Sequence, residues 1–392
     1  MTNEIRIKKK IKPFNKIVQI DGDKSLSIRW ALIASQAIGK SKSINILKSE
    51  DVMSTLNCLK KLGIKVKLSK NICEINGLGL NGYKYKDNLK LDAGNSGTLA
   101  RLIMGLLIHS NKKVKIKGDN SLSRRDFMRV IKPLKEFGAK FKSNNGKLPI
   151  IIEGVKKAKP INYFENKGSA QCKSAIMLAA LNTKGQTVIK ARKSRNHSEL
   201  LFRYLKLPIK IISQKRYDII KISGEKKIRS FNYRIPSDIS SSAFFIVLTA
   251  LTEKSKLKIK NVNINSSRTG IIKILKMMGV KIKFENIKIY KGEKIADLVV
   301  VGTENFKSIN CPSYLNSSAI DEFLVIFLIA AKAKGVSFFK GLSELDQKES
   351  PRLQWATKIL NNLGVKTITT KNSIKIFGNP NLSLNKKVII KN

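Results

Sequence analysis

The chain has 392 residues and carries 77 Lys plus Arg against 27 Asp plus Glu, a formal net charge of +50. With 42% apolar residues and ordinary Gly and Pro counts, it is neither collagen-like nor intrinsically disordered, and its length is typical of two or three domains. The longest unbroken apolar run, residues 323–331, is far shorter than the roughly 20 residues of a membrane-spanning helix. We therefore expect a folded protein without a membrane partner.

The N-terminal stretch and the cysteines indicate a reducing compartment. Residues 1–16 mix charges with single apolar residues and lack the apolar segment of about 7–15 residues that a secretory signal requires. Cys58, Cys73, Cys172 and Cys311 are widely spaced with no CxxC pair, which is typical of structural thiols rather than of a disulfide framework or a zinc site. We expect a cytoplasmic protein that holds no metal.

The excess of basic residues does not by itself indicate a nucleic-acid partner. Lys and Arg along a groove bind phosphates, yet only 14 of the 77 basic residues are Arg, and the Lys fall singly or in pairs through nearly every segment. Scattered Lys is typical of a solvated surface. We expect a generally basic surface that attracts small anions, and no nucleic-acid partner, with a polyanion-binding stripe as the alternative.

Five stretches of the chain share one order of elements. Each has a small-residue motif, an Ala/Leu-rich helix, a Lys-flanked strand, a polar loop, a second amphipathic helix, and then Gly before another strand. The Gly is a natural helix stop. The stretches begin near Ser25, Ser96, Ser169, Ser240 and Ile320. Such a repeat predicts a layered α/β architecture in about two globular bodies.

The sequence also indicates where the chain passes from one body to the other. In residues 231–240, Pro236 stands with Ser and Asp before a fresh apolar helix, which is typical of a boundary. A matching crossing is expected near residue 20. The expected domains are therefore residues 1–20 with 238–392, and residues 21–237.

Polar motifs stand at the expected helix starts in successive repeats. Free N–H groups and the helix dipole favour anions there, and Arg binds carboxylate and phosphate in a planar fork. Each motif alone is compatible with a simply capped helix. Their equivalent places in the repeats predict helix starts gathered around one anion-binding cleft. The motifs are GDKSLSIR (22–29), DAGNSGT (92–98), SRR (123–125), SAQCKS (169–174), SRNHSE (194–199), IDE (320–322) and KESPR (348–352).

In this order and spacing, the motifs resemble those of the 5-enolpyruvylshikimate-3-phosphate synthase (3-phosphoshikimate 1-carboxyvinyltransferase) family, and the resemblance covers nearly the whole chain. It implies a two-domain inverse α/β barrel built from repeated βαβαββ units, three in each domain, with the domains closing over the substrates. It also implies that the N-terminal strand belongs to the domain holding the C-terminal half.

The resemblance implies transfer of the enolpyruvyl group from phosphoenolpyruvate to the 5-hydroxyl of shikimate-3-phosphate, with release of phosphate. This is a step of the shikimate pathway toward chorismate and the aromatic amino acids. The reaction needs no cofactor, and we expect a monomer.

The resemblance also assigns roles to individual residues. Asp321 matches the family's proton acceptor, and Lys24 and Glu349 match positions of proton transfer. The residues implied to bind shikimate-3-phosphate are Lys24, Ser25, Arg29, Ser169, Ala170, Gln171, Arg195, Asp321 and Lys348. Those implied to bind phosphoenolpyruvate are Lys24, Gly97, Arg125, Gln171 and Arg352.

The chain departs from the family pattern at three places. Pro351 stands where Asp is usual, and Asp126 stands where Pro is common. Family members also continue with a Gly-Asp-His-Arg segment that carries another phosphoenolpyruvate-binding Arg, whereas the sequence ends at Asn392. We therefore expect the sixth unit to be missing or incomplete.

Two alternatives stay open. UDP-N-acetylglucosamine enolpyruvyl transferases typically carry a reactive Cys before the second helix of the second repeat, but residues 117–128 contain none. The other alternative is an inactive homologue that keeps the scaffold and binds polyanions through its basic surface.

Overall fold

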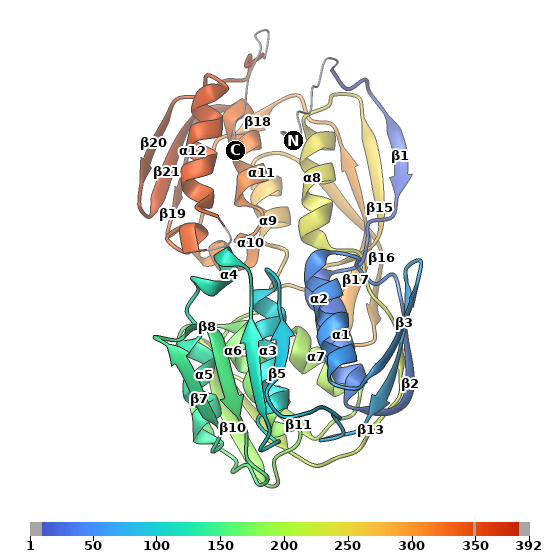
Figure 1. The fold of residues 1–392 in the computed structure, drawn as a ribbon. Helices are drawn as coiled ribbons and strands as arrows, with labels where there is room; N and C mark the ends of the chain where they lie inside the picture. The colour runs from blue at the N-terminus through green and yellow to red at the C-terminus, as the bar shows by residue number, and fades with distance from the viewer. Residues whose placement is uncertain (1–9, 348–349, 384–392) are drawn as a thin grey trace, which may run out of the picture. The chain divides into compact units, whose positions relative to one another are not determined.

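The computed structural model describes residues 10–347 and 350–383, which form two compact units (Figure 1). Among these residues, unit 1 takes 10–20, 239–288 and 295–383, and unit 2 takes 21–238 and 289–294. The chain therefore passes between the units near residues 20 and 238, and again at both ends of the short segment 289–294. The division expected from the sequence left that segment with the C-terminal half.

Three sheets of unit 2 share one strand order. In each, an edge strand runs parallel to the next, which is followed by two antiparallel strands. The first sheet contains β2 (Ala37–Ile44), β3 (Lys65–Ser69), β4 (Ile72–Leu78), β13 (Ile228–Arg229) and β14 (Asn232–Arg234). The second contains β5 (Leu89–Asp92), β6 (Lys113–Lys117), β7 (Lys140–Asn144) and β8 (Lys147–Glu153). The third contains β9 (Asn162–Glu165), β10 (Gln186–Arg192), β11 (Ile209–Ser213) and β12 (Tyr217–Ser223).

Two sheets of unit 1 repeat this order within the described residues. One contains β1 (Asn15–Val18), β15 (Lys256–Asn263), β16 (Lys281–Tyr290) and β17 (Glu293–Val301). The other contains β18 (Phe306–Lys307), β19 (Ala333–Lys340), β20 (Thr367–Thr370) and β21 (Ser373–Gly378). The α/β architecture of repeated units predicted from the sequence is confirmed.

The strands explain how so basic a chain forms apolar cores. In β6, Val114 and Ile116 are buried, whereas Lys113 and Lys117 are exposed. Successive side chains of a strand point to opposite faces, so alternating Lys and apolar residues place charge in solvent and methyl groups in the core. Much of the excess positive charge therefore lies on outer faces.

The two crossings of the chain near residues 20 and 238 pair with each other. Gly22 forms an antiparallel bridge with Ser237, and the N–H of Asp238 donates to the carbonyl of Asp21. The strand before the first crossing, β1, pairs with β15 of unit 1, which comes from the C-terminal half of the chain. The strands before the second crossing, β13 and β14, pair with β2 and complete the first sheet of unit 2.

Each repeat supplies an inner helix and a second, amphipathic helix. The inner helices of unit 2 consist largely of small and aliphatic residues, nearly all of which are buried. They are α1 (Lys24–Ser35), α3 (Gly97–Leu107) and α6 (Ala170–Ala180). The other helices of unit 2 are α2 (Glu50–Lys61), α4 (Asn120–Ser123), α5 (Met128–Glu136) and α7 (His197–Tyr204). Unit 1 contains α8 (Ile239–Ala250), α9 (Gly270–Met277), α10 (Asn316–Ala319), α11 (Phe323–Lys332) and α12 (Arg352–Asn362).

Helices α3 and α6 pack in parallel along their whole length. Three contacts in order connect Thr98 with Gln171, Gly105 with Ala175 and His109 with Ala179. The first is a hydrogen bond of 2.9 Å and the last one of 2.8 Å. Between them, a Cβ placed on Gly105 would lie 2.2 Å from the Ala175 carbonyl oxygen, so the two backbones nearly touch.

Helix α1 is parallel to α6 as well. Near their starts, Nη2 of Arg29 donates to Oγ of Ser174 at 3.1 Å. Past their ends, the side-chain amide of Asn182 donates to that of Gln36 at 3.5 Å. Three helix N-termini of unit 2 therefore lie at one end of the helix layer.

The inner helices of unit 1 are less completely covered. Helices α8 and α11 contact each other, yet Phe244 of α8 is 66% exposed and Leu324 of α11 is 37% exposed. The described part of unit 1 holds two sheets against three in unit 2. No described helix is both long and apolar enough to cross a bilayer.

The contact at Gly105 predicts that replacing this glycine by alanine lowers the free energy of unfolding, contrary to the usual effect of this substitution in a helix. Gly to Ala inside a helix normally stabilises by about 1 kcal/mol, but the new methyl group would press on the Ala175 carbonyl. We expect Gly105→Ala to lower the free energy of unfolding by about 2 kcal/mol or more. Urea unfolding followed by the fluorescence of Trp30, which is buried in α1, measures this in a Trp355→Phe background.

Asn57→Ala is the matched control, because Asn57 is exposed in the interior of α2. It should raise the same free energy by about 0.5 kcal/mol. A stabilised Gly105→Ala protein would show that α3 and α6 are not in backbone contact.

His109 predicts a pH dependence of stability. Burial lowers the pKa of His109 from 6.5 to about 4, although its hydrogen bond to the Ala179 carbonyl acts in the opposite direction. Between pH 4 and 6.5 the unfolded chain therefore binds more protons, and stability is lost as the pH falls through this range. We expect His109→Gln, which keeps a donor, to remove a change on the order of 2–3 kcal/mol. Identical pH profiles of the two proteins in urea would contradict this.

Candidate active site

The three parallel helices of unit 2 begin with the same local device. The residue before each helix accepts, through its side-chain oxygen, the N–H of the residue three positions further on. These caps are Asp23, Ser96 and Ser169. Because the three starts lie at one end of the layer, their partial positive charges add at one place.

Lys24 and Ser25 are the first two residues of α1. The Lys24 N–H donates to the Asp238 carboxylate at 3.1 Å, and its ammonium lies 3.5 Å from Oδ2 of Asp51. The Lys24 side chain is 43% exposed. The ammonium is therefore at the solvent side of the helix start, where it can reach a ligand.

Arg29 lies beneath the helix starts. The residue is 4% exposed. Its guanidinium donates to Oγ of Ser198 at 2.9 Å and to Oγ of Ser174. Burial lowers the pKa of Arg29 to about 10, and the Glu199 carboxylate is the largest opposing influence. Arg29 thus stays protonated at neutral pH and joins α1 to α6 and α7.

Gln171 connects the starts of α6 and α3. Its Nε2 donates to Oγ1 of Thr98 at 2.9 Å, and its Oε1 accepts a hydrogen bond from Nη1 of Arg101 at 2.9 Å. Residues of α3 therefore orient both the nitrogen and the oxygen of the Gln171 side-chain amide. Ser169 and Ala170, the cap and first residue of α6, are adjacent and half-buried.

Two guanidinium groups converge on Gly97, the first residue of α3. A Cβ on Gly97 would lie 2.7 Å from Nη1 of Arg101 and 3.1 Å from Nη1 of Arg125. Arg125 also donates to Oδ1 of Asn95 at 3.4 Å, and Arg101 stacks over the Phe127 ring. Two fixed cations beside a helix start form a strong site for a carboxylate or phosphate.

Arg195 precedes α7 and is half-buried. It is close enough to Arg29 to lower the pKa of that residue. Four residues after Arg195, Glu199 of α7 forms an ion pair of 2.6 Å with Lys173 of α6, and both side chains are buried. The start of α7 therefore belongs to the same group of charges as α1 and α6.

The remaining predicted residues lie in unit 1. Nη1 of Arg352, the first residue of α12, lies 3.1 Å from Oδ1 of Asp321, and the two side chains are 19% and 24% exposed. Glu322 rather than Asp321 occupies the N-cap position of α11, so Asp321 is not a capping residue. Lys348 and Glu349 lie outside the described residues.

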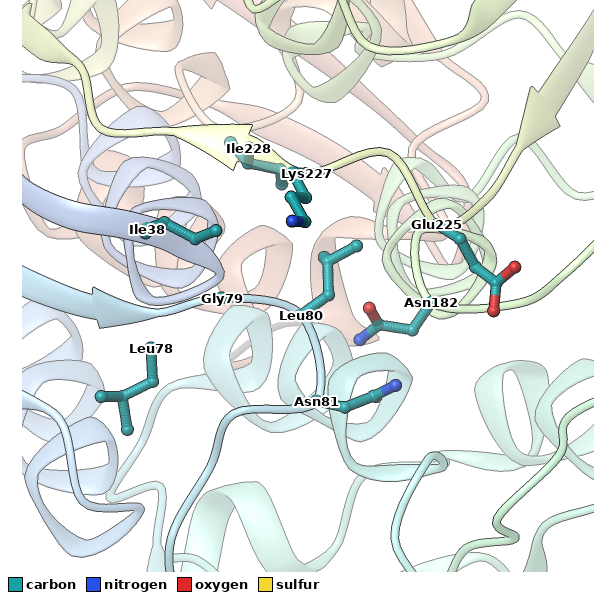
Figure 2. Close-up of a pocket in the computed structure, with 9 residues that line it drawn as sticks. All are labelled: Ile38, Leu78, Gly79, Leu80, Asn81, Asn182, Glu225, Lys227 and Ile228. Carbon is teal, nitrogen blue, oxygen red and sulfur yellow. The ribbon is translucent and has the colours of Figure 1, made fainter.

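A separate pocket of about 310 Å³ lies at the opposite end of the helices of unit 2 (Figure 2). Ile38 and Asn182 in its wall follow the C-terminal ends of α1 and α6. A helix of 11 residues is about 16 Å long, so this pocket is distinct from the helix starts. The full lining is Ile38, Leu78, Gly79, Leu80, Asn81, Asn182, Glu225, Lys227 and Ile228.

Comparison with known proteins identifies the family. A family model described as EPSP synthase (3-phosphoshikimate 1-carboxyvinyltransferase) matches residues 8–387. The chain belongs to this family. It is 39% identical over 372 residues to the 3-phosphoshikimate 1-carboxyvinyltransferase of Ruthia magnifica subsp. Calyptogena magnifica, covering 94% of this chain and 84% of that protein. It is 38% identical over 369 residues to the enzyme of the same name from Petrotoga mobilis, with 93% and 84% covered.

A solved structure agrees. EPSP synthase from Acinetobacter baumannii matches with a TM-score of 0.83 and 35% identity, covering 94% of this chain and 82% of that one. The family and fold implied by the motifs are confirmed. Family members bind shikimate-3-phosphate and phosphoenolpyruvate, and the matches support enolpyruvyl transfer in the shikimate pathway as the activity of this chain. Neither alternative weighed from the sequence finds support in them.

Two buried charged residues that contact the start of α7 were not evident from the sequence. Lys173 has a weak signal, since it is the one Lys in the apolar helix α6, and such a residue needs a buried partner. Glu293 has none, because it lies 96 residues from the His197 side chain that it contacts.

Gly97 tests the anion site at the start of α3. The added methyl group in Gly97→Ala would displace the ends of two flexible Arg side chains but no backbone. We expect an EPSP synthase that folds normally, with KM for phosphoenolpyruvate raised about tenfold and KM for shikimate-3-phosphate nearly unchanged. Steady-state phosphate release measures both constants. Equal rises in the two constants would show that Gly97 does not distinguish the substrates.

Proposed function

We propose that the three helix starts of unit 2, together with Asp321 and Arg352 of unit 1, bind the two substrates and carry the enolpyruvyl transfer. The observation that supports this best is the convergence of three capped helix starts with Lys24, Arg125 and Gln171 at one end of unit 2.

Phosphoenolpyruvate is proposed to bind at the start of α3. Gly97 allows an anion to approach the backbone, and Arg125 supplies the planar fork of donors. Gln171 and Lys24 approach from α6 and α1. Arg352 of unit 1 is proposed to supply a further guanidinium, with phosphoenolpyruvate replacing Asp321 as its anionic partner.

Shikimate-3-phosphate is proposed to bind at the starts of α1 and α6. Ser25, Ser169 and Gln171 offer donors and acceptors that suit its hydroxyl and acid groups, with Ala170 beside them. Arg195 faces the phosphate, and Lys348 completes the set from unit 1. Arg29 adds positive charge from beneath, since its own donors hold Ser174 and Ser198.

The chemistry needs a base and an acid. Asp321 accepts the proton of the 5-hydroxyl while that oxygen forms a bond to C2 of the enol, and C3 gains a proton. In the second step C3 loses a proton and the C–O bond to phosphate breaks, which restores the double bond. Lys24 and Glu349 are proposed to carry these protons. Holding the hydroxyl against C2 contributes up to roughly 7–11 kcal/mol in the best intramolecular models.

The reaction needs no cofactor, because inorganic phosphate is itself the leaving group. We also propose that the protein acts as a cytoplasmic monomer. Sedimentation of the purified protein tests the monomer directly.

Asp321→Asn tests the proposed base. Losing general base catalysis should lower kcat about 10²–10⁴-fold while thermal stability stays close to that of the wild type. Phosphate release with both substrates present measures the rate. The charge-matched control is Glu304→Gln, at an exposed position of unit 1, which should keep the full rate. Equal background rates in the wild type and Asp321→Asn would favour an inactive homologue.

A further inference from the structure

We propose that Glu293 is a positioning residue for the phosphate-binding part of the site: through His197 it sets the start of α7 and thereby the place of Arg195. The proposal rests on the phosphate-binding role proposed above for Arg195. It concerns contacts within unit 2 only.

Glu293 reaches α7 from the tip of the β16–β17 hairpin. The tip, residues 289–294, groups with unit 2, although the rest of both strands belongs to unit 1. The Tyr290 hydroxyl accepts the N–H of Arg234 at 3.1 Å, and the Lys291 ammonium donates to the carbonyl of Asn232. Strand β14 thus holds the tip in place.

The tip also approaches the backbone of α7. A Cβ on Gly292 would lie 2.7 Å from the carbonyl oxygen of Leu200, and Gly292 has φ +89°. Only glycine tolerates both conditions. The next residue, Glu293, is therefore delivered to α7 by a rigid turn rather than by a flexible loop.

The contact that follows is a buried one. Oε1 of Glu293 lies 2.7 Å from Nδ1 of His197, and both side chains are 1% exposed. An ionised carboxylate only accepts hydrogen bonds, so Nδ1 carries the proton. Without such a donor, burying the carboxylate would cost much free energy. The contact therefore favours one position of His197 relative to Glu293.

His197 is one of three consecutive anchors in the first turn of α7. Ser198 accepts from Nε of Arg29 at 2.9 Å, and Glu199 pairs with Lys173 at 2.6 Å. These two anchors come from α1 and α6, whereas the first comes from the hairpin. Arg195 stands two residues before His197, so the anchor nearest to it is the one that Glu293 supplies.

The charges agree with this geometry. The pKa of Arg29 is lowered mainly by burial and further by Arg195, while Glu199, Asp23 and Glu293 raise it. Glu293 therefore acts on the same group of charges as Arg195. Its carboxylate helps the Arg29 guanidinium to remain protonated.

The test compares ligands that differ only in the phosphate. We expect Glu293→Gln, which leaves His197 Nδ1 a neutral acceptor in place of a charged one, to weaken binding of shikimate-3-phosphate about tenfold, roughly the difference between a charged and a neutral hydrogen bond. Binding of shikimate, which has no phosphate, and KM for phosphoenolpyruvate should change less than about twofold. Calorimetry and steady-state kinetics measure these values, and His197→Gln should reproduce them if Glu293→Gln does not fold.

Glu285→Gln is the matched control, since it makes the same change of charge at an exposed position of the same hairpin, where Glu285 pairs with Lys258; it should bind both ligands normally. Equal losses for shikimate and shikimate-3-phosphate, or the same loss in Glu285→Gln, would overturn the proposal. Arg195→Gln distinguishes the phosphate-binding role of Arg195 from the positioning role of Glu293. If it leaves shikimate-3-phosphate binding intact, the role of Arg195 fails; if it weakens binding while Glu293→Gln does not, only the positioning role fails.

Discussion

The parallel packing of the inner helices is the constraint on which the rest of unit 2 depends. Because α3 runs in the same direction as α6 from Thr98 to His109, and α1 also runs in the direction of α6, three helix N-termini come to one place. The close approach is possible because Gly105 has no side chain to separate α3 from the Ala175 carbonyl. Antiparallel neighbours would place N- and C-termini together, and their partial charges would cancel.

The two kinds of basic residue serve different purposes in this molecule. Lys dominates the composition and lies mainly on outer faces of strands, as in β6. Arg is scarce, and Arg29, Arg101 and Arg125 stand where donors are held in a plane by neighbouring helices and loops. A guanidinium keeps its charge when buried more readily than an ammonium does, and its several donors can hold neighbouring helices while still facing a ligand. The net charge of +50 therefore does not indicate where the candidate site lies, whereas Arg29, Arg101 and Arg125 all lie at or below the helix starts.

The exchange of chain segments between the units matters for the same site. The crossings at Gly22 and Ser237 pair with each other directly before α1, so the helix that carries Lys24 begins at a crossing point. The hairpin tip with Glu293 is a second exchanged segment, and it anchors α7 rather than completing a sheet. Segments that pass from one unit to the other thus contribute to the starts of two helices that we propose to bind substrate.

Local signals in the sequence determined the repeats, the helix starts and the residues that stand at them. Periodicity, caps and glycine stops act within a few residues, which is why the motifs at Ser96 and Ser169 could be placed without a structure. Only the tertiary structure decided that Arg29 is buried and shared by three helices, that Lys173 and Glu199 neutralise each other, and that Glu293 meets His197. These contacts join segments far apart in the chain, and the energy of a buried charge depends on which partner the fold brings to it. No local pattern encodes that choice of partner.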